Sequence, residues 1–273
     1  MRLGISSALE HGSAKEWAEK QKALGCKAVV FPIDSKADTS EIDAYADAAH
    51  ACDLMIAEVG IWKNPLSSEA SEKKEAMEYS VAQLKLADYL KARCCVNITG
   101  TTGSRWDGAY PQNFSEDLWK QSVRMIQEVI DRADPKNTAF TIEPMPWMIP
   151  TGPDEYLQLI KEVNRECFAV HMDFFNMINC PQRYLFHEQF MDECFQKLGS
   201  YIKSCHLKDV KLLPEFTFQL KECACGEGEI NLEHYIRRIN EIDPEMPVII
   251  EHLQEDREYI DSVRYVKERL SLV

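Results

Sequence analysis

The sequence predicts an α/β protein that forms a single (β/α)8 TIM barrel over residues 1–273. Eight short apolar runs with β-strand character alternate with longer amphipathic runs along the chain. Four of the short runs, all in the second half, end in a side chain that can bind a metal ion. No stretch rich in Pro, Gly or Ser interrupts this alternation as an interdomain linker would. Eight strand–helix units in a chain of this length favour one closed barrel over two domains.

The expected strands are runs of about five to seven residues, bounded by loop or helix signals. In the first half they read LGISS near residue 3, AVVFP near 28, LMIAEVG near 54 and CCVNITG near 94. In the second half they read AFTIEP, FAVHMD, SCHLKD and PVIIEH. Because parallel strands need a crossover connection, usually a helix, the alternation predicts a parallel sheet.

Helix boundaries are indicated by capping residues. Ser13 begins a capping-box motif that opens a helix, and Gly25 ends that helix. Ser115 precedes an acidic first turn, and Ser71 is expected to open a long helix that runs to about Lys91. These helix boundaries agree with the alternation of eight strands and helices that predicts the barrel.

The segments that follow several strands are longer than a minimal barrel needs. They cover residues 100–115, 144–153, 174–187 and 208–231. In barrels of this kind the loops after the strands surround the active site. We therefore expect the pocket at the carboxyl ends of the strands.

The four candidate metal ligands are Glu143, Asp173, His206 and Glu251. The intervals between them are 30, 33 and 45 residues, each long enough for a strand, a helix and two loops. Successive units would therefore bring the four side chains to the same end of the sheet. Three carboxylates and one imidazole suit Mn²⁺, Mg²⁺, Co²⁺ or Zn²⁺ and leave room for a substrate.

Composition and charge favour small uncharged partners. The formal net charge of −14 disfavours binding to nucleic acid or to acidic membrane surfaces. The first residues, MRLGISSALEHG, lack the apolar core of a secretory signal, and no run approaches the roughly 20 apolar residues of a membrane span. We expect a cytoplasmic protein, and the sequence leaves open whether it pairs with copies of itself.

The ten cysteines are expected to be reduced thiols. Several lie inside apolar runs, and no CxxC pair occurs. Cys223 and Cys225, which lie in a loop ahead of Gly226, are more readily explained as an ordinary loop pair than as a metal or redox site.

The segments EPMPW, HMDFFN, HLKDV, GEGEIN and IIEH, in this order and spacing, carry a family resemblance. The chain resembles the sugar phosphate isomerase/epimerase group with a xylose isomerase-like TIM barrel, which includes ketose 3-epimerases, hydroxypyruvate isomerase and inosose dehydratase. The resemblance implies that Glu143, Asp173, His206 and Glu251 bind one divalent metal ion, with Mn²⁺ the first expectation. It also implies that Glu143 and Glu251 act on the protons of the substrate.

Such a site predicts a metal-dependent isomerase or epimerase of a ketose or keto-sugar derivative. A cation that binds a carbonyl oxygen and a neighbouring hydroxyl would stabilise the enediolate formed when a carboxylate removes the proton beside the carbonyl. The alternative is a dehydratase or lyase that eliminates a group from a keto-inositol or 3-keto-glycoside. An abasic-site endonuclease, or a barrel without catalytic activity, fits the sequence less well.

Several further residues are expected to contact the substrate. Strand periodicity directs His171 into the barrel with Asp173, and Lys208 into it with His206, whereas His252 should face away from Glu251. The remaining expected contacts are Glu58 at the end of the third strand and the rim indoles Trp62, Trp106 and Trp147.

The sequence departs from the epimerase pattern at two places. Asn176 stands where these enzymes usually carry a His, and Lys208 and Lys211 stand near the position of an Arg. Asn176 can bind a hydroxyl but cannot carry a proton, so a free ketohexose is not the assured substrate. Asn231 replaces an Asp common in relatives, a change that concerns helix capping.

Overall fold

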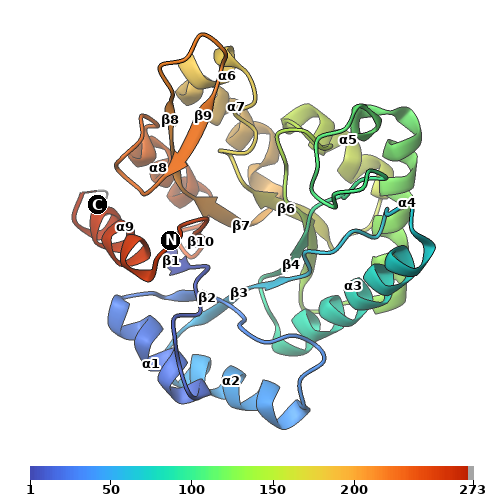
Figure 1. Ribbon diagram of the computed structural model, residues 1–273. Helices are drawn as coiled ribbons and strands as arrows, with labels where there is room; N and C mark the ends of the chain where they lie inside the picture. Colours follow the sequence, from blue (N-terminus) through green and yellow to red (C-terminus); the bar gives the residue numbers. More distant parts are fainter. Residues whose placement is uncertain (270–273) are drawn as a thin grey trace.

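Eight parallel strands curve into a nearly closed barrel surrounded by helices, as the computed structural model shows (Figure 1). The structure describes residues 1–269. Hydrogen-bonded neighbours follow the order β1, β10, β7, β6, β5, β4, β3, β2. The strands are β1 (Arg2–Ile5), β2 (Ala28–Val30), β3 (Met55–Gly60), β4 (Cys94–Asn97), β5 (Ala139–Ile142), β6 (Phe168–Met172), β7 (Ile202–Leu207) and β10 (Pro247–Ile250). The predicted (β/α)8 barrel is confirmed.

The barrel closes between β1 and β2. The Lys27 amide donates a hydrogen bond to the Leu3 carbonyl at 2.7 Å, which joins the two ends of the sheet. A Cβ atom on Gly4 would lie 2.3 Å from the Ala28 carbonyl oxygen. Glycine at this position therefore permits the close approach of the two strands.

Helices cover the outer face of the sheet (Figure 1). They are α1 (Ala14–Leu24), α2 (Thr39–Ala51), α3 (Ala70–Leu90), α4 (Glu116–Ala133), α5 (Pro153–Val163), α6 (Pro181–Leu185), α7 (His187–Leu198), α8 (Leu232–Ile242) and α9 (Asp256–Arg269). Short 3-10 turns occupy Pro111–Phe114 and Gly199–Tyr201. Within residues 1–269, none of the helices has the length and apolar character needed to cross a bilayer.

Most of the expected helix caps are present. Ser13 accepts a hydrogen bond from the Glu16 amide, and Gly25 ends α1 with a left-handed backbone. Ser115 caps α4 in the same way as Ser13 caps α1. The expectation for Ser71 is wrong, because α3 begins one residue earlier and Ser71 lies inside its first turn.

One pair of strands was not predicted. The segment expected to be a long loop after His206 folds into an antiparallel hairpin of β8 (Asp209–Leu212) and β9 (Leu220–Cys223). Polar and apolar residues alternate over Asp209–Leu212 and over residues 216–221, and this short alternation is the signal in the sequence that could have indicated the two strands. The hairpin directly follows β7 and lies beside the carboxyl end of the barrel (Figure 1).

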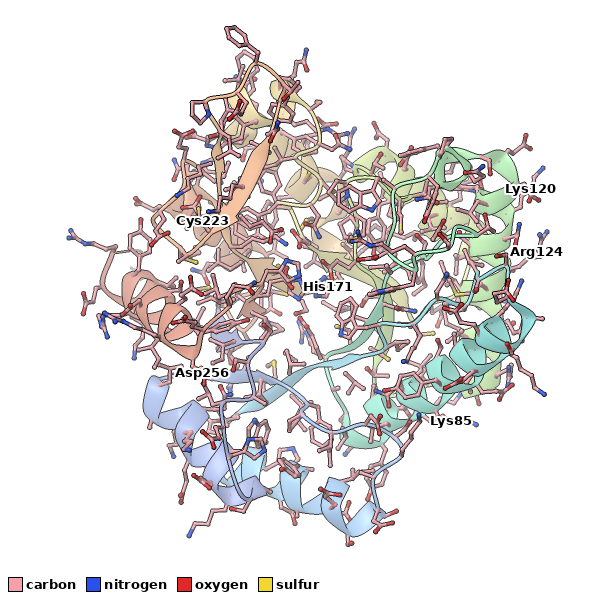
Figure 2. The ribbon with its side chains drawn as sticks, viewed as in Figure 1. Lys85, Lys120, Arg124, His171, Cys223 and Asp256 are labelled. Carbon is pink, nitrogen blue, oxygen red and sulfur yellow. The ribbon has the colours of Figure 1, made fainter. Side chains whose placement is uncertain are left out.

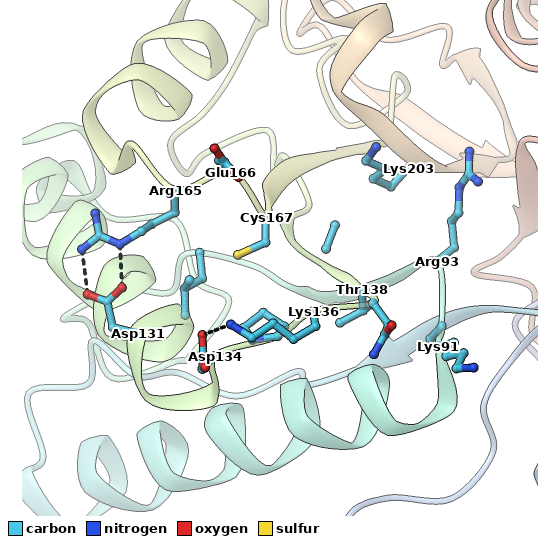
Figure 3. Close-up of a pocket in the computed structure, with 15 residues that line it drawn as sticks. Lys91, Arg93, Asp131, Asp134, Lys136, Thr138, Arg165, Glu166, Cys167 and Lys203 are labelled. Atoms are coloured by element: carbon cyan, nitrogen blue, oxygen red, sulfur yellow. Dashed lines mark hydrogen bonds and ion pairs between the residues drawn. The ribbon is translucent and has the colours of Figure 1, made fainter.

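A cavity of about 1080 Å³ lies at the opposite end of the barrel (Figure 3). Residues at the starts of β4, β5, β6 and β7 line it. Ion pairs join Arg165 to Asp131 and Lys136 to Asp134 in its lining. None of the expected site residues lines it, and barrel enzymes bind substrate at the other end.

Candidate active site and metal centre

The carboxyl end of the barrel interior holds an unusual number of buried polar side chains. Figure 2 shows His171 near the centre of the barrel, among side chains from several strands. Each member of this group is less than 7% exposed: Glu58, Glu143, His171, Asp173, Asn176, Ser204, His206, Lys208 and Glu251. Burial of so many polar groups is costly unless they pair with one another or bind a ligand.

Consecutive strands position the four expected ligands. Glu143, Asp173 and Glu251 are each the first residue after a strand, β5, β6 and β10 respectively. His206 is the penultimate residue of β7, which lies between β6 and β10 in the sheet. One ligand atom from each side chain lies within 4.8 Å of all the others. The structure thus brings the four together, as the spacing predicts.

The donor atoms of this group fit a metal ion. His206 Nδ1 lies 2.9 Å from Glu251 Oε2, 3.6 Å from Glu143 Oε1 and 3.7 Å from Asp173 Oδ2. His206 Nδ1 and Asp173 Oδ2 are both buried without a hydrogen-bond partner among the described residues. Unpaired buried polar atoms that face one another are the arrangement a bound cation would satisfy.

Lys208 supplies a positive charge beside these carboxylates. Its ammonium group donates to Glu251 Oε1 at 2.7 Å and lies 2.8 Å from Asp173 Oδ2, although not in hydrogen-bond geometry. It also lies 3.3 Å from Glu222 Oε1 on β9, and so joins the hairpin to the site. The side chain is 1% exposed.

Asn176 links the ligands to one another. Its amide nitrogen Nδ2 donates to Glu143 Oε1 at 2.9 Å, and its backbone amide donates to Asp173 Oδ1 at 2.9 Å. Its Oδ1 accepts from Lys208 at 3.1 Å. Asn176 therefore holds two carboxylates in place, Glu143 through its side chain and Asp173 through its backbone amide, and neither contact needs a proton transfer.

The electrostatics of the group follow from burial and from these contacts. Burial raises the pKa of Glu143. Burial acts in the same sense on Glu251, but the positive charges of His206 and Lys208 outweigh it, and the pKa of Glu251 is lowered. Burial disfavours the charged form of His206, yet the surrounding carboxylates hold its pKa well above the ordinary value.

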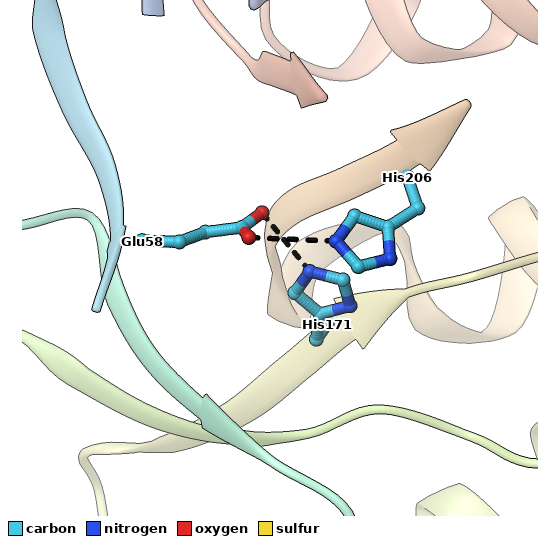
Figure 4. A group of neighbouring side chains, drawn as sticks. All are labelled: Glu58, His171 and His206. Carbon is cyan, nitrogen blue, oxygen red and sulfur yellow. Dashed lines mark hydrogen bonds and ion pairs between the residues drawn. The ribbon is translucent and has the colours of Figure 1, made fainter. Parts of the chain in front are cut away.

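Glu58 lies deeper than expected. It occupies the middle of β3 rather than its end, and its side chain is 1% exposed. Its Oε1 accepts from His171 Nε2 at 3.0 Å and from the Ser204 hydroxyl, and its Oε2 lies 3.4 Å from His206 Nε2 (Figure 4). Burial opposes ionisation, but His171 and His206 lower the pKa of Glu58. His171 points into the barrel, as the strand periodicity predicts.

A cavity of about 420 Å³ opens above the site. Strand ends and rim loops line it: Ser6, Val30, Glu58, Trp62, Ile98, Trp106, Asp107, Glu143, Met145, His206, Glu251 and His252. Trp62 and Trp106 therefore face the cavity. Trp147 instead donates from its indole to the Asp107 carbonyl at 2.7 Å and is not among the lining residues.

The expectation that His252 faces away from the site is wrong. The strand β10 ends at Ile250, and His252 has a left-handed backbone with φ of 59°, so strand alternation no longer applies. His252 Nε2 lies 3.4 Å from Glu251 Oε2, and its Nδ1 lies 3.0 Å from Glu222 Oε2. A second cavity of about 320 Å³ adjoins these residues. Neither contact has a signal in the linear sequence.

Cys223 and Cys225 are buried free thiols. Burial raises the pKa of Cys223 to about 11 and that of Cys225 to about 12. Thiols with raised pKa are poor nucleophiles and poor metal ligands at neutral pH. Neither belongs to a group of metal-binding side chains among the described residues.

Comparisons with known proteins agree with this architecture. The family model described as "Xylose isomerase-like TIM barrel" matches residues 18–269. The comparison with curated proteins gives no match. Solved structures with the same fold, each covering nearly the full length of both chains, differ in their activities.

Three of these structures illustrate the range. A D-psicose 3-epimerase from Clostridium cellulolyticum, solved with D-tagatose, is 18% identical over 100% of both chains with a TM-score of 0.72. The probable 3-DHS dehydratase AsbF from Bacillus anthracis is 14% identical over 98% of this chain and 100% of that one, with a TM-score of 0.75. Endonuclease IV from Thermus thermophilus is 13% identical over 98% of each chain, with a TM-score of 0.70. At these identities the likeness shows the fold alone.

Proposed function

The chain belongs to the xylose isomerase-like TIM barrel family, and from its site we propose that it is a divalent-metal-dependent isomerase or epimerase of a ketose or keto-sugar derivative. The observation that carries this proposal is the convergence of four ligand side chains from consecutive strands on one buried point. Two of their donor atoms, His206 Nδ1 and Asp173 Oδ2, have no hydrogen-bond partner among the described residues.

Glu143, Asp173, His206 and Glu251 would hold the ion. Their three carboxylates, with the ammonium group of Lys208, leave two negative charges when His206 is neutral, which one divalent cation balances. Oxygen and imidazole donors suit Mn²⁺ first, with Mg²⁺, Co²⁺ or Zn²⁺ as alternatives. When bound, the ion supplies positive charge for the oxygen that becomes negative as a proton leaves the neighbouring carbon.

Glu143 and Glu251 are the proposed acid and base. They leave the barrel from β5 and β10, which β6 and β7 separate, so they approach the cavity from different sides. Both line the 420 Å³ cavity. One carboxylate would take the proton from the carbon beside the carbonyl, and the other would return a proton to the opposite face or to the adjacent carbon. The first outcome inverts the centre and the second isomerises the sugar.

The cavity walls suit a sugar. The indoles of Trp62 and Trp106 offer apolar faces to a sugar ring. Lys208 and Asn176 do not line this cavity and instead bind the carboxylates of the site. Trp147 would contribute to the pocket indirectly, because its indole donates a hydrogen bond to the carbonyl of Asp107, which lines the cavity.

A dehydratase or lyase is the second candidate. His252 lies beside Glu251 and lines both cavities, so a further titratable group stands near the position where a leaving group would depart. A leaving group beta to a ketone needs a proton as it departs, which such a side chain can give. The substrate would then be a keto-inositol or a 3-keto-glycoside. We do not propose a nuclease, because the charge of −14 opposes binding to DNA.

Product analysis in heavy water separates the two candidates. The protein, loaded with Mn²⁺ and then freed of excess ion, would be incubated with ketoses, keto-inositols and 3-keto-glucosides in D₂O and followed by NMR and mass spectrometry. An epimerase or isomerase gives products of unchanged composition with deuterium at one carbon, whereas elimination gives loss of water or of the aglycone. No exchange and no product with any of these compounds, at full metal occupancy, would contradict both.

A further inference from the structure

Glu58 forms a buried link across the barrel interior. Glu58 lies on β3. Three side chains from β6 and β7, which β4 and β5 separate from β3 in the sheet, face its carboxylate: His171, Ser204 and His206. Both oxygens are engaged by these protein groups, as Figure 4 shows for the two histidines. Although Glu58 lines the 420 Å³ cavity, it is 1% exposed and both of its oxygens already face protein donors, so it is better placed to hold these side chains than to bind substrate.

His206 faces two different groups with its two nitrogens. Nδ1 points toward the carboxylates of the metal centre, 2.9 Å from Glu251 Oε2. Nε2 points the other way, 3.4 Å from Glu58 Oε2. A neutral imidazole has one N–H group and one lone pair, and only the nitrogen with the lone pair can bind a metal ion.

His171 restricts the ring further. Its imidazole packs edge-on against that of His206, with ring centroids 4.1 Å apart and planes at 74°. Its own Nε2 is fixed on Glu58 Oε1. Rotation of the His206 ring would therefore disturb both the packing and the contact with Glu58.

We propose that Glu58 is a positioning residue that holds His206 in the tautomer with hydrogen on Nε2, so that Nδ1 presents its lone pair to the divalent ion. This inference rests on the proposed function, because it takes the four-residue metal centre as its starting point. Glu58 then acts through His206, and the expected direct contact of Glu58 with substrate gives way to this role.

The tautomer can be observed in the unaltered protein. NMR of ¹⁵N-histidine-labelled protein loaded with Zn²⁺, with the His206 signals assigned from the His206→Asn variant, reports which nitrogen carries the proton. We expect the proton on Nε2 and the metal on Nδ1. A proton on Nδ1, with the metal on Nε2, would overturn the proposal.

Metal affinity supplies the second test, without any substrate. The Glu58→Gln variant keeps the size of the side chain but offers one acceptor oxygen to three donors, so Mn²⁺ binding measured by titration calorimetry should weaken about 10- to 100-fold. The matched control, Glu78→Gln, makes the same change of charge on α3, where Glu78 is exposed and pairs with Arg132, and should bind Mn²⁺ as the wild type does. Circular dichroism and thermal melting establish that both variants fold.

The outcomes separate this role from the proposed function. Wild-type affinity in Glu58→Gln, or an equal loss in Glu78→Gln, would refute the role of Glu58 while the metal centre stands. A wild-type protein that binds no divalent ion at all would overturn the metal centre, and the role of Glu58 with it.

Discussion

At the scale of single residues, the ammonium group of Lys208 compensates carboxylates that lie in the closed interior of the barrel. We predict that Lys208→Met lowers the free energy of unfolding of the metal-free protein by about 3–5 kcal/mol, because Asp173 and Glu251 lose their buried partner. Saturating Mn²⁺ should restore much of this loss. Thermal denaturation with and without Mn²⁺ measures both effects.

Lys211, on the neighbouring hairpin strand, provides the control for that substitution. It has no ion pair with the ligand carboxylates, so Lys211→Met should change stability by no more than about 0.5 kcal/mol. If Lys208→Met were as stable as Lys211→Met in the absence of metal, the charge balance described for the site would be wrong.

The two proposed acid–base residues give a prediction about proton exchange. With Mn²⁺ at saturation, Glu143→Gln and Glu251→Gln should each lower kcat by about 100-fold or more, because an amide cannot transfer the proton. If each carboxylate serves one face of the substrate, each variant should still exchange deuterium into one of two epimers and not into the other. Exchange into both epimers by either variant would contradict the two-base assignment.

At the scale of elements, Asp209 organises the segment between the hairpin and α8. Its Oδ1 accepts from the backbone amides of Val210 and Ile230, and its Oδ2 accepts from those of Gly226 and Gly228. A Cβ atom on Gly228 would lie 2.2 Å from Asp209 Oδ1, so the close approach of the backbone to this carboxylate requires glycine at position 228. This contact holds the base of the hairpin that carries Glu222 toward the site.

We predict that Asp209→Ala lowers the free energy of unfolding by roughly 2–3 kcal/mol, since four backbone amides lose their acceptor. Turnover should fall as well, because the hairpin would no longer hold Glu222 beside Lys208. Glu227→Ala, an exposed change in the same segment, is the comparison. Urea denaturation of the two variants would reveal whether they differ, and equal stability would contradict the role of Asp209.

The same elements show what the sequence could and could not predict. Residues that end apolar runs, such as Glu143 and Asp173, follow directly after strands, and the sequence predicts their convergence because parallel strands bring their ends together. Glu58 was placed too near the rim, since a run of apolar residues does not reveal where a strand ends within it. The expected orientation of His252 is wrong because strand alternation stops at Ile250. The backbone at His252 is left-handed, and a residue other than glycine gives no sign of this in the sequence.

At the scale of the whole molecule, the barrel was predictable because eight strand–helix units with consistent local signals leave few alternative topologies. The substrate was not, because the same fold supports epimerases, dehydratases and nucleases, and rim loops determine the chemistry. The hairpin at residues 209–223 and the turns around it belong to this variable rim. Contacts between Lys208 and Glu222 form only once the chain is folded.

Metal binding should stabilise the whole barrel, because the ligands come from four different strand ends. A free Mn²⁺ concentration about 100-fold above Kd should add about 2.7 kcal/mol to the free energy of unfolding and raise Tm by several degrees. A chelator should reverse the shift. In Glu251→Gln the shift at the same Mn²⁺ concentration should be smaller, and an undiminished shift would place the ion elsewhere.

The most direct measurement is anomalous diffraction from crystals of the protein grown with Mn²⁺. We predict one strong anomalous peak among Glu143, Asp173, Glu251 and Nδ1 of His206, with Nε2 of His206 still facing Glu58. A peak at another place, or no peak in crystals grown with a large excess of Mn²⁺, would contradict the metal centre on which the proposed chemistry depends.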